Sequence, residues 1–134
     1  MANGSYWQTK AEWQRVEEPL LRLDSALSEF AAQFGLQLTK NHKDWPERSI
    51  EWGTRVRLLI QVYLADAESL TFNLWLCASQ DRGGKRFWRQ ETPIQSKPVS
   101  DFQSSFASLL LEGKAKLEGW SEADLEFVTN VAPL

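Results

Sequence analysis

The sequence predicts an α+β fold, a two-layer sandwich in which helices from both ends of the chain cover one face of an antiparallel meander sheet of four or five strands. Three observations support it. Apolar residues recur at helical spacing before residue 35, alternate with a period of two between residues 36 and 92, and return to helical spacing after residue 98. No linker or repeat divides the 134 residues. We therefore expect one domain over 1–134, with mobile ends at 1–8 and 130–134.

An N-terminal helix is expected between Thr9 and Gly35. Thr9 and Glu12 form a capping-box pattern, and Gly35 is suited to end the helix in a left-handed conformation. The apolar stripe between them recurs in steps of three and four and consists of Trp13, Val16, Leu20, Leu23, Leu27, Phe30 and Phe34. Pro19 interrupts this stripe, so either the helix kinks there or a second helix begins with Pro19 in its first turn.

Strands are expected from Leu36 onward. A short strand around 36–38 and another around 49–52 flank a loop over 41–47. Residues 55–65 show the clearest alternation. One face carries Val56, Leu58, Ile60, Val62 and Leu64, and the other carries Arg57, Leu59, Gln61 and Tyr63.

The next strand alternates over 70–77 after a turn at 66–69. Pairing Leu64 with Leu70 keeps the two apolar faces together. This register places Leu59 opposite Trp75, and Arg57 opposite Cys77.

A diglycine turn then leads into a strand over 85–92, predicted as an edge strand. Its orientation has two solutions. Turning Trp88 toward the helices leaves Phe87 and Arg89 on the outer face. Turning Phe87 inward places Arg86 and Trp88 on the outer face. It also turns three charged side chains toward the helices, which is unfavourable unless they stay solvated; these are Lys85, Arg89 and Glu91. We prefer the orientation with Trp88 inward.

Two prolines, Pro93 and Pro98, are expected to close the sheet. A capping pattern at Ser100 then predicts a long helix, and another at Ser121 predicts a short one. Their apolar residues are Phe102, Phe106, Leu109, Leu110 and Leu117 in the long helix, and Leu125 and Val128 in the short one.

Composition excludes several classes of protein. One Cys and one His cannot form a disulfide or a Cys/His metal centre within one chain, and we expect no metal and no cofactor. No leader pattern and no apolar stretch near 20 residues is present, which predicts a cytoplasmic protein without a membrane partner. Residues 40–97 carry ten basic and seven acidic side chains, whereas both flanking segments are acidic.

No motif specifies a reaction. His42 lies in a charged loop, and a solvated histidine is the preferred interpretation. Cys77 paired with His42 as nucleophile and base is disfavoured, because a strand interior is an unusual place for an activated thiol. The Gly83-Gly84-Lys85 sequence lacks the spacing of a phosphate-binding loop. An enzyme with a site between the His42 loop and the sheet edge remains an alternative.

The sheet face away from the helices is the best candidate for a function. Its expected residues mix basic and aromatic types: Arg57, Leu59, Tyr63, Trp75, Phe87 and Arg89. Such surfaces are typical of protein interfaces. We therefore predict a non-enzymatic binding or adaptor domain that uses this face for protein binding or homodimerisation. A single-stranded nucleic-acid binder is less favoured by the net charge of −3, and cross-strand pairing that only shields the sheet is the structural alternative.

Overall fold

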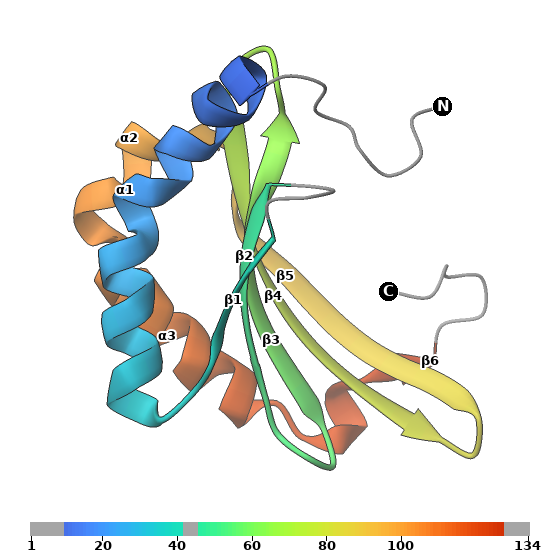
Figure 1. Cartoon of the computed structure of the whole chain (residues 1–134). Helices are drawn as coiled ribbons and strands as arrows, with labels where there is room; N and C mark the ends of the chain where they lie inside the picture. The colour runs from blue at the N-terminus through green and yellow to red at the C-terminus, as the bar shows by residue number, and fades with distance from the viewer. Residues whose placement is uncertain (1–9, 42–45, 128–134) are drawn as a thin grey trace.

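The structure, a computed structural model, describes residues 10–41 and 46–127 and confirms the α+β class (Figure 1). Six antiparallel strands form a meander in the order β1-β2-β3-β4-β5-β6, and the helices lie on one face. The elements are α1 Lys10–Phe34, β1 Leu38–Asn41, β2 Glu47–Trp52, β3 Arg57–Asp66, β4 Thr71–Arg82, β5 Lys85–Pro98, α2 Val99–Phe102, η1 Gln103–Ser105, α3 Phe106–Gly119, η2 Glu122–Asp124 and β6 Glu126–Phe127. Among the described helices, none is long and apolar enough to cross a membrane.

The predicted N-terminal helix is a single helix, α1, that continues through Pro19. Five residues of its stripe are buried against the sheet, Val16, Leu20, Leu23, Leu27 and Phe30, whereas Phe34 at the end of the stripe is exposed. Gly35 ends the helix with φ 66°, and the N–H of Leu36 donates to the carbonyl of Ala31 at 2.8 Å, which is the bond of a Schellman cap. Thr9 of the expected capping box lies outside the described residues.

The predicted pairing of β3 with β4 has the correct faces but the wrong register. Leu64 lies opposite Phe72 instead of Leu70, so Leu59 faces Cys77 and Arg57 faces Ser79. The reason lies in the turn, because Leu70 adopts φ 53° and belongs to the reversal, not to the strand. A shift of two residues keeps every side chain on its predicted face.

Strand β5 is longer than the predicted 85–92 segment and passes through Pro93 to Pro98. Two register shifts make this possible. Between the pairs Leu76 with Glu91 and Leu74 with Ile94, β5 has one residue more than β4, so Pro93 lies in a bulge. A proline, which has no N–H to donate, is tolerated at such a position.

The C-terminal part differs from the prediction in two ways. The expected long helix is split into α2 and α3 by the 3-10 turn η1. The expected short helix is only the 3-10 turn η2, although its capping box between Ser121 and Asp124 is present as predicted. Leu125 is buried, and the chain then adds β6 to the edge of β5, where Phe127 lies opposite Phe87.

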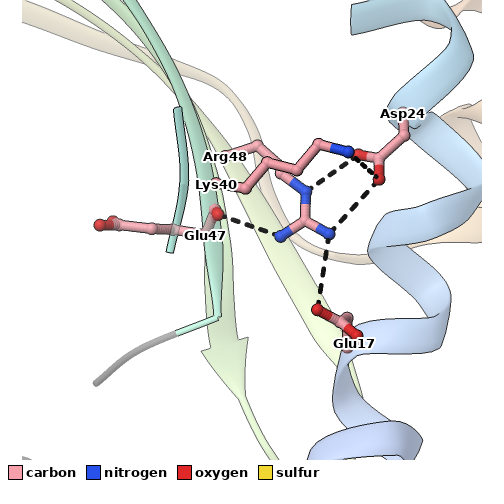
Figure 2. A network of polar contacts seen from close by, with 5 residues as sticks. All are labelled: Glu17, Asp24, Lys40, Glu47 and Arg48. Carbon is pink, nitrogen blue, oxygen red and sulfur yellow. Dashed lines mark hydrogen bonds and ion pairs between the residues drawn. The ribbon is translucent and has the colours of Figure 1, made fainter. Parts of the chain in front are cut away.

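A buried arginine joins α1 to the sheet (Figure 2). The side chain of Arg48 on β2 is fully buried on the helix-facing side of the sheet. Its Nε donates to Oδ1 of Asp24 at 2.9 Å, its Nη1 donates to the carbonyl of Glu47 at 3.2 Å, and its Nη2 lies 3.9 Å from Glu17. Lys40 adds a second cation 3.2 Å from Asp24. A buried charge is tolerated only with such partners.

Candidate functional site

The candidate site is the sheet face opposite the helices, here called the open face. Within the described part of the chain, no helix covers it (Figure 1). Four of the six predicted residues lie there: Arg57, Leu59 and Tyr63 from β3, and Trp75 from β4, which faces Gln61 across the strand pair. Because side chains of a strand alternate, all four point away from the buried row that contains Ile60.

The other two predicted residues, Phe87 and Arg89, lie on the helix-facing side, so the preferred orientation of β5 is wrong. Phe87 faces Gln80 and Arg89 faces Ala78, and both of these β4 residues are buried on the helix-facing side. The ring of Phe87 packs against the core beneath the guanidinium of Arg82, at 4.2 Å.

The three charged side chains that argued against this orientation, Lys85, Arg89 and Glu91, all remain at least partly solvated and find partners. The ammonium of Lys85 lies 5.6 Å from the ring centre of Phe127. The guanidinium of Arg89 lies 4.7 Å from the ring centre of Trp120 and 3.9 Å from Asp124. Glu91 accepts from the ammonium of Lys116 at 2.7 Å. The desolvation free energy that was expected to oppose turning these charged side chains toward the helices is therefore small.

Trp88 takes the place of Phe87 on the open face, where it faces Ser79. Tyr63, Trp75 and Trp88 thus form a row across three strands, which we call the aromatic ladder. The ring centres of Tyr63 and Trp75 are 6.3 Å apart, as are those of Trp75 and Trp88, with interplanar angles of 77° and 84°. All three residues are partly exposed. This is the second of the two orientations that the sequence allowed for the 85–92 strand, with Trp88 on the outer face.

A polar pocket of about 470 Å³ lies beside the aromatic ladder, and we call it the arginine pocket. Ser79 joins the two features, because it lines the pocket and lies opposite both Arg57 and Trp88. The complete lining is Glu51, Thr54, Arg55, Arg57, Ser79, Gln80, Asp81 and Arg86. Sequence reasoning identified Arg57 as an outward residue but missed the pocket, because its walls come from separate hairpins.

Each arginine of the pocket has a carboxylate partner. Arg57 pairs with Glu51, and Arg86 pairs with Asp81 at 3.3 Å. Arg55 pairs at 2.7 Å with Glu122 of η2, which lies outside the lining. These side chains are largely exposed, and exposed ion pairs contribute only about 0–1 kcal/mol. The carboxylates can therefore be displaced by a competing anion.

The open face also contains Cys77, which is buried between its neighbours. Desolvation by burial raises the pKa of its thiol to about 11, although Arg86 opposes the shift. A protonated thiol is a poor nucleophile at neutral pH. His42, considered from the sequence as a general base for Cys77, lies outside the described residues. Among the residues that are described, no group of three or more His, Cys, Asp or Glu side chains is placed to hold a metal ion.

Comparison with protein-family models, curated proteins and solved structures finds no match for this chain.

Proposed function

We propose that this protein is a non-enzymatic binding domain whose open face receives a segment of another polypeptide. The observation that carries the proposal is the aromatic ladder of Tyr63, Trp75 and Trp88. Partly exposed tryptophan and tyrosine side chains bordered by arginines are the residue types that dominate binding energy at protein interfaces.

The ring geometry favours a polypeptide over single-stranded nucleic acid. The interplanar angles of 77° and 84° mean that each ring of the ladder meets its neighbour edge to face. A nucleic-acid platform instead presents open ring faces for bases to stack on. The net charge of −3 also opposes binding to a phosphate backbone.

The sheet edges are poorly suited to pair with an additional strand, so we expect the partner to bind across the open face. Strand β1 at one edge has only four residues. At the other edge, β5 contains Pro93, Pro98 and two bulges, and its described partner β6 pairs only at Phe87 and Trp88. Short strands, prolines and bulges are features that discourage further pairing.

We infer a different polypeptide in preference to a second copy. A two-fold interface brings the same patch of both subunits together. If that interface were centred near Trp88, it would bring the Arg57–Glu51 and Arg86–Asp81 pairs of both copies together and remove water from four ion pairs at once, which is unfavourable.

The test is a selection of random peptides displayed on phage against the intact protein, followed by affinity measurements on the selected peptides. We expect Trp75→Thr and Trp88→Thr to weaken their binding by roughly tenfold or more, since a central aromatic contributes about 2 kcal/mol or more. Leu21→Ser is the matched control, because Leu21 is 51% exposed and lies on the helix layer. Circular dichroism verifies that each variant is folded.

Two results would overturn this proposal. In one, every selected peptide binds the tryptophan variants as tightly as the unsubstituted protein. In the other, sedimentation equilibrium shows a dimer that Trp88→Thr dissociates, which would identify a second copy as the occupant of the open face.

A further inference from the structure

The arginine pocket adjoins the Trp88 end of the aromatic ladder. Arg57 and Ser79 face each other across β3 and β4, and Ser79 faces Trp88 across β4 and β5. The distance from one strand to the next in a sheet is about 5 Å. An anionic group one or two residues away from a side chain that contacts Trp88 is therefore within reach of the pocket.

Two of the guanidinium groups retain hydrogen-bonding capacity. In the described part of the chain, Arg57 donates to Glu51 through Nη2 alone, and Arg86 donates to Asp81 through Nε alone. A guanidinium has five N–H donors in a planar fork that matches a carboxylate. Arg55 contributes less, because both its Nε and its Nη2 are engaged by Glu122.

The charges of the pocket favour a monoanion. Its lining carries three arginines against Glu51 and Asp81, and Glu122 compensates Arg55 from outside. A phosphate group would bring about −1.5 to −2 charges into surroundings that already contain these carboxylates. A single carboxylate adds only one negative charge, and it can take the place of Glu51 or Asp81 on its arginine while the displaced side chain, 48% or 70% exposed, turns toward solvent.

We propose that the arginine pocket binds a carboxylate of the polypeptide that the aromatic ladder holds. The proposal rests on the proposed function and adds to it the chemistry of the partner, which presents an apolar or aromatic side chain followed closely by a carboxylate. Two sources supply this group: the side chain of Asp or Glu, or the C-terminal carboxylate of the partner.

The first experiment needs no partner. Sodium acetate and inorganic phosphate are titrated separately into the full-length protein at constant ionic strength, with chloride as the balancing anion, and the arginine Nε–H signals are followed by NMR. We expect acetate to shift Arg57 and Arg86 saturably, and Arg22, an exposed arginine of α1, to remain unchanged. Equal shifts at Arg22, or stronger binding of phosphate than of acetate, would overturn the assignment of a carboxylate.

The second experiment uses the peptides selected on the open face. Replacing their acidic side chains by the amides, or amidating their C-terminus, distinguishes the two sources of the carboxylate. We expect one of these changes to weaken binding roughly tenfold, since a charge-assisted hydrogen bond contributes about 1.5–3 kcal/mol. The protein variants Arg57→Gln and Arg86→Gln are expected to remove that preference, whereas Arg22→Gln retains it.

The two proposals fail in different ways. Peptides that need Trp75 but bind equally well in acidic and amidated forms would overturn the carboxylate site and leave the binding function standing. Acetate binding at Arg57 and Arg86, together with peptides that ignore Trp75 and Trp88, would support the anion site and overturn the binding function.

Discussion

Nε of Arg48 lies 2.9 Å from Oδ1 of Asp24, and this ion pair connects β2 to α1 through the interior (Figure 2). The arginine side chain is fully buried, whereas that of Asp24 is 14% exposed. Removing one member of a buried ion pair leaves the other charge buried without a partner. The resulting loss of folding free energy is larger than the net contribution of the intact pair. A position of α1 on the sheet in which Asp24 does not meet Arg48 is therefore disfavoured.

We expect Asp24→Ala to lower the free energy of unfolding by about 3 kcal/mol, near the lower end for a broken buried pair because Glu17 remains close to Arg48. Urea unfolding monitored by circular dichroism measures the change. Glu51→Gln is the matched control, since it removes the exposed partner of Arg57 and is expected to change stability by less than about 1 kcal/mol. Equal effects of the two substitutions would contradict a structural role for the buried pair.

Cys77 is expected to react very slowly with iodoacetamide in the folded protein. With a pKa of about 11, roughly one thiol in a thousand is ionised at pH 8, and burial restricts access further. The rate of alkylation measured by mass spectrometry should therefore rise at least a hundredfold when the protein is unfolded in urea. Similar rates in the folded and unfolded protein would show that the thiol is activated, in favour of the enzyme alternative.

The turn between β3 and β4 predicts a local dependence on pH. The Ser69 hydroxyl donates to Oδ2 of Asp66 at 2.6 Å, the Ser69 backbone N–H donates to the same atom, and these bonds lower the pKa of Asp66 from 3.8. Ser69→Ala should raise this pKa toward 3.8, and carboxyl NMR titration measures it. The pKa of Asp124, which Ser121 lowers, is the internal control and should not change.

The sign of the stability effect follows from the direction of this shift. Because the pKa of Asp66 is lower in the folded state, its contribution is complete above about pH 3.8 and is lost as the pH falls through the folded value. Ser69→Ala should therefore destabilise the protein at neutral pH but not in strong acid. A difference of the same size at both extremes would argue against this linkage.

Gly53 should tolerate substitution less well than Gly84. Both have positive φ values, 92° and 82°, but a Cβ on Gly53 would clash with the backbone oxygen of Val56, whereas one on Gly84 has nothing within 4 Å. Gly84→Ala should cost about 1 kcal/mol from backbone strain alone. We expect Gly53→Ala to cost at least about 1 kcal/mol more in urea unfolding, and to broaden the NMR signals of Thr54 and Arg55 in the arginine pocket.

The elements that were predicted correctly are those with a local cause. The apolar stripe of α1, the alternation of β3 and the diglycine turn each depend on residues a few positions apart. The capping box of Ser121 and Asp124 is likewise contained in four residues. A hydrophobic period determines which side of an element is buried, whatever lies opposite it.

The features that were missed depend on distant residues. The orientation of β5 was wrong because Arg89 is accommodated by Trp120 and Asp124, more than 30 positions away. Arg48 was not identified as a buried residue, because its partner Asp24 lies on α1, 24 positions away. Neither contact leaves a local pattern in the sequence.

The amino-acid sequence alone therefore determined the two layers, the meander of strands and four of the six residues expected on the open face. Only the tertiary structure decided the strand register, the exchange of Phe87 for Trp88, and the gathering of Arg55, Arg57 and Arg86 around one pocket. The physical reason is that periodicity reflects burial of one residue at a time. Register and pocket formation reflect turn geometry and charge pairing between strands, which take effect only once the chain has folded.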